Sequence, residues 1–240
     1  MIIIINFILD LIYPPKCIVC DNIIEFGSKK FLCDECKDLF KTITGRRCEK
    51  CSRPIKHGKL CSICTKKNFY FDKNYSLFVY DELMQDLIHR FKFKNHPAIG
   101  KGLGKIMAHE INFDVIKNVD YILAVPIHKI RRRNRGFNQS EILAKEIARK
   151  MNLPMRADIL KRIKNTKPQW HLNSHERENN LENAFSAKNV KGLNLMLIDD
   201  IFTTGSTINK CAQFLKDAGA KSVISFTLSI TVKKNEPKNN

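Results

Sequence analysis

The sequence has no run of apolar residues long enough to cross a membrane. Its most apolar stretch, MIIIINFILDLIYPP at residues 1–15, is interrupted by Asn6 and Asp10, whereas a membrane-spanning helix needs about 18 or more uncharged apolar residues. The stretch also lacks a basic n-region and a small-residue cleavage site, which argues against a secretory signal peptide. We therefore predict a short amphipathic helix that ends at Pro14–Pro15, in a cytoplasmic protein. Peripheral membrane attachment is the alternative.

Acidic residues are scarce. The 240 residues include 24 Asp and Glu against 42 Lys and Arg, a net charge of +18. Such an excess favours polyanionic partners such as nucleic acid or phosphates, although a solvated lysine-rich surface gives the same count. Hydrophobic residues make up 43% of the chain, which excludes a disordered protein and allows one ordinary domain with a small module.

Cysteines are concentrated near the amino end. Eight of the nine form four C-x-x-C pairs within residues 17–64. Without a secretory signal a disulfide framework is not expected, and four such pairs indicate metal rather than one redox site. Two pairs supply the four thiolates of a tetrahedral zinc ion. We pair them in sequence order, and cross-bracing between alternate pairs remains open. The predicted ligands are Cys17, Cys20, Cys33 and Cys36 at one zinc, and Cys48, Cys51, Cys61 and Cys64 at the other.

Both predicted zinc sites are structural. Thiolates fill every position, so no ligand position is left for water or substrate. Few large apolar residues lie between Cys17 and Cys64, so metal binding must supply much of the folding energy there. Basic residues such as Arg46 and Arg53 keep a nucleic-acid role of this module open. Cys211 stands alone in a helical pattern and is predicted to be a buried apolar residue.

After Cys64 the pattern alternates between strands and helices. This alternation predicts an α/β fold, an open parallel sheet flanked by helices on both faces, preceded by a small zinc-ribbon module. We divide the chain into residues 1–70, 71–232 and a disordered tail at 233–240. The predicted strands are residues 74–82, 119–127, 195–198 and 222–230, and the predicted helices are 83–93, 98–111, 138–150 and 207–218.

One predicted strand ends in a segment suited to binding a phosphorylated sugar. Residues 195–207 read LMLIDDIFTTGST, so a buried strand delivers Asp199 and Asp200 at its carboxyl end, where open α/β sheets bind ligands. The small-residue loop Thr203–Thr207 leads into a helix amino terminus, whose N–H groups and dipole suit a phosphate. Gly205 allows close backbone approach, and the two carboxylates suit vicinal sugar hydroxyls. An acidic strand end with an ordinary helix cap is the alternative.

These residues resemble a known family. LMLIDDIFTTGST is similar to the phosphoribosyl pyrophosphate (PRPP) motif of type I phosphoribosyltransferases, and there is no P-loop motif. Together with LIYPPKC, VPIHKIRRRNRGFNQSEILAKEIA and RIKNTKPQWHLNSHERENNLENAF, it resembles the ComF/GntX family over nearly the whole chain. The resemblance implies a double zinc ribbon (residues 1–70) followed by a phosphoribosyltransferase-like domain (71–232). It also implies a role in single-stranded DNA uptake during natural transformation, beside a helicase-like partner.

The resemblance also assigns site residues. Asp199 and Asp200 would bind the ribose hydroxyls of PRPP, with Mg²⁺ held mainly by the ligand's own oxygens. The 5′-phosphate would be held by Thr203, Thr204, Gly205, Ser206 and Thr207. The pyrophosphate would be faced by the turn of Pro126, Ile127 and His128.

Basic residues cluster near this predicted site. Between His128 and Arg177 there are 14 Lys and Arg residues and 4 Asp and Glu residues, a local charge of +10. Arg131, Arg135, Lys167 and Arg177 are candidates for neutralising a pyrophosphate, and the same surface suits a single-stranded backbone. We expect residues 162–177 to form a long loop over the site.

Two functions of different classes follow. One is a phosphoribosyltransferase, a glycosyltransferase that displaces pyrophosphate from PRPP. The other is a protein that handles nucleic acid, in which PRPP binding is regulatory or vestigial. The sequence shows neither an acceptor-binding hood nor a clear general base beside Asp199 and Asp200, so turnover is left open. We favour a PRPP-binding protein that acts in DNA uptake.

Overall fold

The structure is a computed structural model that describes residues 14–25, 28, 30–93, 96–164 and 184–232. The helix predicted before Pro14 and the tail predicted after residue 232 lie outside the described residues. Among the residues that are described, no helix has the length and apolar character needed to cross a membrane.

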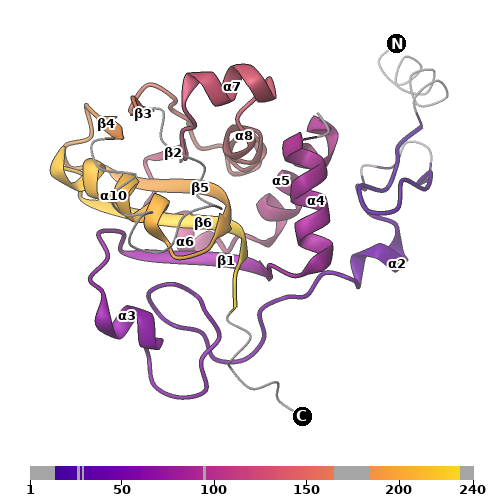
Figure 1. Cartoon of the computed structure of the whole chain (residues 1–240), viewed down its shortest axis with the longest axis horizontal. Coiled ribbons are helices and arrows are strands. Elements are labelled where there is room, and N and C mark those ends of the chain that lie inside the picture. The colour runs from indigo at the N-terminus through magenta and orange to yellow at the C-terminus, as the bar shows by residue number, and fades with distance from the viewer. Residues whose placement is uncertain (1–13, 26–27, 29, 94–95, 165–183, 233–240) are drawn as a thin grey trace.

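A four-stranded parallel sheet forms the centre of the molecule (Figure 1). Its strands follow the order β1-β6-β5-β2, and β5 is hydrogen-bonded on both sides, with Leu195 opposite both Tyr121 and Val223. The open parallel sheet expected from the sequence is therefore confirmed. The strands are β1 (Lys73–Val79), β2 (Tyr121–Ala124), β5 (Asn194–Phe202) and β6 (Ser222–Ile230).

Alternate residues of β5 enter two different hydrophobic cores. Leu195 and Leu197 are buried with α10 and the second set of cysteines, whereas Met196 and Ile198 are buried with the helices of the other face. Helices therefore cover both faces, as expected from apolar strands without polar alternation. The helix of the first face is α10 (Ser206–Asp217), and those of the second are α4 (Glu82–Phe93), α5 (Pro97–Glu110) and α8 (Gln139–Met151).

Local signals explain the bounds of α8. The Asn138 side chain accepts a hydrogen bond from the backbone N–H of Ser140, which caps the amino end of the helix. Asn152 ends the helix in the left-handed conformation. The close packing of α5 against this helix requires glycine at position 104, where a Cβ would lie 3.2 Å from the Cα of Leu143.

Several short elements were not expected from the sequence. The helix α7 (Lys129–Arg135) lies where only a basic segment was recognised, and a small antiparallel pair lies beyond the edge of the main sheet. The strand predicted at residues 119–127 is limited to four residues, and the strand predicted at 195–198 continues to Phe202. The remaining short elements are α2 (Asp34–Lys37), α3 (Ser62–Lys66), α6 (Phe113–Ile116), β3 (Leu160–Arg162) and β4 (Phe185–Ala187).

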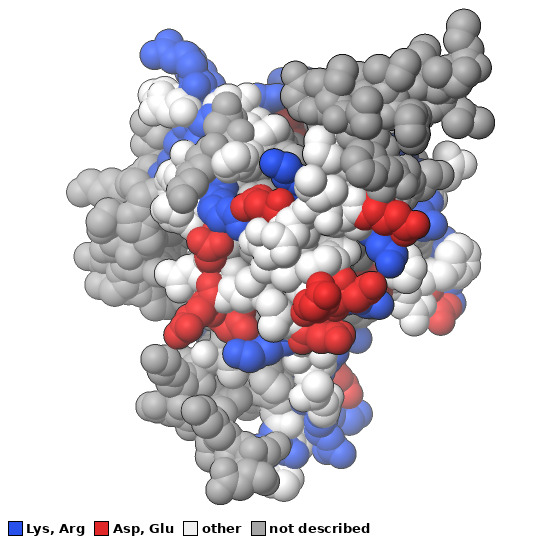
Figure 2. Space-filling view, turned by 90° about the vertical axis from the view of Figure 1, so that its right-hand side faces the viewer, with Lys and Arg blue, Asp and Glu red and all other residues white. Residues whose placement is uncertain are grey.

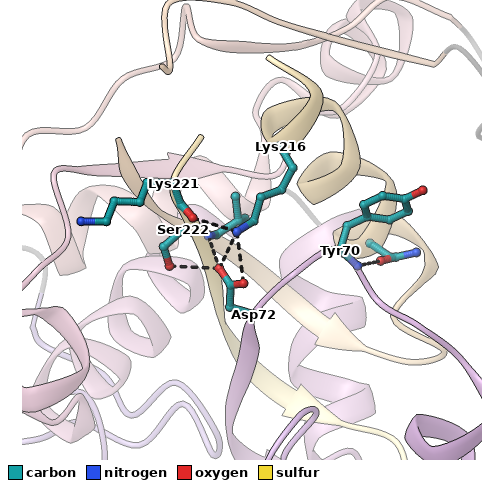
Figure 3. A network of polar contacts seen from close by, with 7 residues as sticks. Tyr70, Asp72, Lys216, Lys221 and Ser222 are labelled. Carbon is teal, nitrogen blue, oxygen red and sulfur yellow. Dashed lines mark hydrogen bonds and ion pairs between the residues drawn. The ribbon is translucent and has the colours of Figure 1, made fainter. Parts of the chain in front are cut away.

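Asp72 ties the start of β1 to the far end of the chain (Figure 3). Its carboxylate accepts hydrogen bonds from Lys216 Nζ, Ser222 Oγ and the backbone N–H of Val223. Burial opposes ionisation, but these donors outweigh it and lower the pKa of Asp72. The contact fixes the register of the first and last strands and the position of α10 over them.

Candidate functional site

The eight paired cysteines form two separate clusters. Within each cluster the sulfur atoms all lie within 4.8 Å of one another, and the Sγ atoms of Cys51 and Cys61 are 3.7 Å apart. Four sulfurs around one zinc ion in a tetrahedron lie about 3.8 Å apart, so the residues fit two structural zinc sites. The clusters are Cys17, Cys20, Cys33 and Cys36, and Cys48, Cys51, Cys61 and Cys64, which confirms the sequential pairing and excludes cross-bracing.

The two clusters repeat one backbone design. Each cluster begins with a C-x-x-C turn, here called a knuckle: residues 17–22 in the first and residues 48–53 in the second. In the first knuckle the N–H of Cys17 donates to the carbonyl of Asn22 at 2.8 Å, and in the second the N–H of Cys48 donates to the carbonyl of Arg53 at 2.7 Å. One non-glycine residue of each turn, Asp21 and Ser52, has a positive φ. The doubling seen in the cysteine spacing is therefore a structural repeat.

The clusters differ in what surrounds them. In the first, Cys17 and Cys36 are buried with Ile24 in a small core, whereas Cys20 is exposed. The neighbouring Ile18 belongs to the core that contains α4 and α5. The second lies in the main core shared with β5 and α10. There the side chain of Asn74 on β1 donates to the carbonyl of Cys51 and to the hydroxyl of Ser76. The second zinc-binding module, residues 46–64, is thus an integral part of the main domain.

A cleft of about 760 Å³ lies at the carboxyl edge of the sheet. Its floor is the end of β5, one wall is α4, and the other combines α7 with Arg162 of β3. The structure brings eight of the predicted site residues to this cleft. They are Pro126, Ile127, Arg131, Arg135, Asp199, Asp200, Thr203 and Thr207.

Two adjacent carboxylates form the floor. Ser140 Oγ donates a 2.8 Å hydrogen bond to Asp199 Oδ1, and the ammonium of Lys92 forms an ion pair with Asp200 Oδ2. Burial, together with the neighbouring charge of Asp200, raises the pKa of Asp199 from 3.8 to about 7. Asp199 therefore exchanges its proton near neutral pH, while Asp200 is paired with a cation.

The loop from Thr203 to Thr207, here called the phosphate loop, is built as the sequence predicts. Gly205 has a φ of +79°, and a Cβ there would meet the ring of Phe202 at 2.6 Å, so both conformation and space require glycine. The hydroxyls of Thr204 and Ser206 lie 2.7 Å apart. The helix α10 begins directly after this glycine, and the N–H of Ser206 in its first turn donates to Thr204 Oγ1 at 3.3 Å.

Three guanidinium groups, those of Arg131, Arg135 and Arg162, share one wall of the cleft, and Arg135 also lies over the ring of Phe93 at the end of α4. Burial lowers the pKa of Arg131 and Arg135 and brings that of Arg162 to about 10, and the charge of Arg131 contributes to this lowering at Arg162. Holding like charges together in a partly buried wall costs free energy, which an anionic ligand would offset. The residues that face each other across the cleft thus suit a ligand with hydroxyls and anionic groups.

Some predicted residues do not meet at the cleft. His128 is buried and accepts a hydrogen bond from the N–H of Ile130, so it caps α7. Thr204, Gly205 and Ser206 shape the loop without lining the cleft. Lys167 and Arg177 lie outside the described residues.

Sequence reasoning missed two cations of this cleft. Lys92 stands at the end of a helix whose apolar stripe gave no sign of a ligand-binding face, and Arg162 stands on a three-residue strand that no periodicity marks. The only available signal was their position in an unusually basic chain.

The two zinc sites predict a difference between two cysteine variants. We expect the purified protein to contain two zinc ions, and Cys33→Ser to lose one of them with little change in the melting temperature of the main domain. Cys51→Ser should lose the other and lower that temperature strongly, because its site lies in the main core. Metal analysis and thermal unfolding decide this, and equal destabilisation by both variants would contradict it.

The raised pKa of Asp199 predicts a pH-dependent stability. The folded protein holds this proton more tightly than the unfolded chain, so the associated stability is complete below pH 3.8 and lost as pH rises through about 7. Asp199→Asn keeps an oxygen for Ser140 and needs no ionisation. We expect its melting temperature to exceed that of the wild type by about 3 °C or more at pH 8, and by about half as much at pH 5.5. A difference independent of pH would refute the assignment.

Comparison with known proteins agrees with both parts of the structure. A family model described as a double zinc ribbon domain matches residues 8–65, and one described as a phosphoribosyl transferase domain matches residues 138–240. The chain superimposes on glutamine PRPP amidotransferase from B. subtilis with a TM-score of 0.39 and 18% identity, over 57% of this chain and 30% of that one.

Three curated relatives cover most of the chain. Competence protein F of Haemophilus influenzae is 30% identical over 87% of this chain and 93% of its own. Competence protein ComFC of Bacillus subtilis is 32% identical, over 82% and 83% respectively. DNA utilization protein YhgH of Salmonella typhimurium is 31% identical, over 73% and 80%. With its double zinc ribbon and its phosphoribosyltransferase domain, this chain belongs to the competence protein F (ComF) family.

Proposed function

We propose that this protein binds PRPP in the cleft and acts in the handling of single-stranded DNA during natural transformation. The observation that carries the proposal is the arrangement of one carboxylate pair, one phosphate loop and one arginine wall around a single cleft. Each group matches a different part of the same ligand. Outside the cleft, the basic helix α7 is a candidate surface for DNA.

The carboxylates and the phosphate loop would hold the ribose 5-phosphate part. Asp200 would accept a hydrogen bond from a sugar hydroxyl, which must compete with Lys92 for the carboxylate. Asp199, held by Ser140, offers the second acceptor. The N–H groups at the start of α10 and the hydroxyls of Thr203 and Thr207 would surround the 5′-phosphate.

The arginine wall would hold the pyrophosphate. Arg131 and Arg135 lie one helical turn apart on α7, and Arg162 joins them from β3. Bidentate guanidinium groups match phosphate oxygens in geometry and charge. A Mg²⁺ ion carried by the oxygens of PRPP would reduce its repulsion from the carboxylate floor.

DNA would bind outside the cleft, on the other side of α7. Lys129, Arg132 and Arg133 are exposed there, although Arg132 is paired with Glu141 at 2.7 Å. By contrast, the described surface seen in Figure 2 mixes acidic with basic side chains, which does not suit a continuous phosphate track. The names of the relatives, competence proteins and DNA utilization proteins, support a role with DNA. A helicase-like partner remains part of this proposal.

A phosphoribosyltransferase of nucleotide metabolism with no DNA role is the second candidate. This alternative is favoured by the part of the cleft that bound PRPP would leave empty. Tyr80, Gln85 and His89 line the cleft there, beside the predicted position of the ribose. An acceptor placed there could attack the sugar as pyrophosphate leaves toward the arginine wall. Release of pyrophosphate in the presence of a candidate base would favour this alternative.

PRPP binding is tested with calorimetry in the presence of Mg²⁺. Asp200→Asn removes a charged acceptor for a ribose hydroxyl, and we expect affinity to fall about 10- to 150-fold. Thr204→Val should weaken PRPP and ribose 5-phosphate in parallel, since both carry the 5′-phosphate. Asp217→Asn, an equal charge change at the exposed end of α10, is the control. A wild-type protein that binds no PRPP would refute the proposal.

DNA binding is tested by the salt dependence of affinity for a single-stranded oligonucleotide. Replacing Lys129 and Arg133 with Ala should flatten the slope of log affinity against log salt by about 1.4, at about 0.7 for each lost phosphate contact. Replacing Lys101 and Lys221, which are also exposed, removes the same charge elsewhere and should leave the slope nearly unchanged. The same slope in both double variants would place the DNA surface on another part of the protein.

A further inference from the structure

The second zinc-binding module reaches the phosphate loop through one buried side chain. Arg53 ends the second knuckle, and only 7% of its surface is exposed. One guanidinium nitrogen donates to Cys51 Sγ at 3.6 Å, and another donates to the backbone carbonyl of Thr203. A single planar group therefore joins a predicted zinc ligand to the first residue of the phosphate loop.

Arg53 also contacts the ring on which this loop rests. Its guanidinium carbon lies 5.4 Å from the centre of the Phe202 ring, in the range of a cation–π contact. The same ring approaches Gly205 so closely that no Cβ fits between them. Phe71, which follows the zinc-binding module, packs edge-on against the Phe202 ring, and the two ring centres lie 5.8 Å apart. Arg53 thus supports the phosphate loop at two points: the backbone carbonyl of Thr203 and the ring of Phe202 beneath Gly205.

The first knuckle shows that the turn itself does not require arginine. Asn22 occupies the position of Arg53 and makes the same backbone hydrogen bond. An asparagine side chain is too short to reach a loop beyond the module. The arginine therefore serves the contact with Thr203 rather than the fold of the knuckle.

The orientation of the Thr203 carbonyl matters for an anionic ligand. A carbonyl oxygen turned toward a phosphate would repel it, whereas N–H groups attract it. The bond from Arg53 keeps this oxygen occupied, and the hydroxyl of Thr231 donates to it as well, at 3.5 Å. The start of α10, rather than a carbonyl oxygen, would then face the ligand.

We propose that Arg53 is a positioning residue through which the second zinc-binding module holds residues 203–207 in the conformation that binds a 5′-phosphate. The ligand named here rests on the function proposed above. Metal in the second site, but not in the first, then supports the phosphate loop.

Hydrogen exchange in the ligand-free protein tests the support directly. Arg53→Asn copies the residue of the first knuckle, and Arg46→Asn removes the same charge from an exposed position of the same module. We expect amide exchange of residues 203–209 to be several-fold faster in Arg53→Asn than in Arg46→Asn, with two zinc ions in both. Equal exchange in the two variants would overturn the proposal.

Binding of two simple probes tests the consequence. Ribose 5-phosphate should bind about 3- to 10-fold more weakly to Arg53→Asn than to Arg46→Asn, the range for one lost hydrogen bond. Inorganic pyrophosphate should bind equally to both, because it would contact the arginine wall. If ribose 5-phosphate does not bind even the wild type, the proposed function fails, and the exchange experiment still decides whether Arg53 holds the loop.

A folding failure is handled by a second variant. If Arg53→Asn loses zinc, Arg53→Gln, which keeps a longer side chain without the charge, is measured in the same way. Zinc loss in both variants would overturn the proposal, because Arg53 would then serve the metal site itself.

Discussion

The parallel pairing of the four strands in the main sheet brings most of the charged groups of the cleft to one edge. Because parallel strands end at the same edge, the carboxylates of β5 and the basic helix that follows β2 meet there. The strand β1 ends at this edge too, so the helix after it brings Lys92 to the carboxylate floor. Residues far apart in sequence thereby become one site.

This convergence carries a cost in stability. The cleft gathers three guanidinium groups on one wall and two adjacent carboxylates on its floor, and burial acts against the charge of Arg162 and of Asp199. Charged groups that are buried against their preference in this way are typical of binding sites, where the charges of a ligand balance those of the protein. Two extensive apolar cores, one on each face of the sheet, offset the cost.

The sequence predicted those features that depend on local pattern. Apolar runs marked β2, β5 and β6, and the spacing of cysteines marked two metal clusters, because neighbouring residues carry this information. It could not predict that Lys92 pairs with Asp200 or that Arg53 reaches Thr203, since tertiary packing brings these residues together. Nor did it predict the helix α7, whose periodicity separates Arg131, in the cleft, from exposed Arg133. The ligands of the cleft remain predictions.

The pairing of the first strand with the last has a consequence for synthesis of the protein. Asn74 of β1 and Ser225 of β6, which share a hydrogen bond, are 151 residues apart, so β1 stays unpaired until β6 has been synthesised. Each cysteine cluster closes within a short preceding segment and can bind metal much earlier. During synthesis the chain therefore carries metal-binding clusters that can already be closed, followed by strands whose edges are still unpaired. Unpaired strand edges are prone to aggregation, so the interval between the synthesis of β1 and that of β6 is the period of greatest risk for this chain.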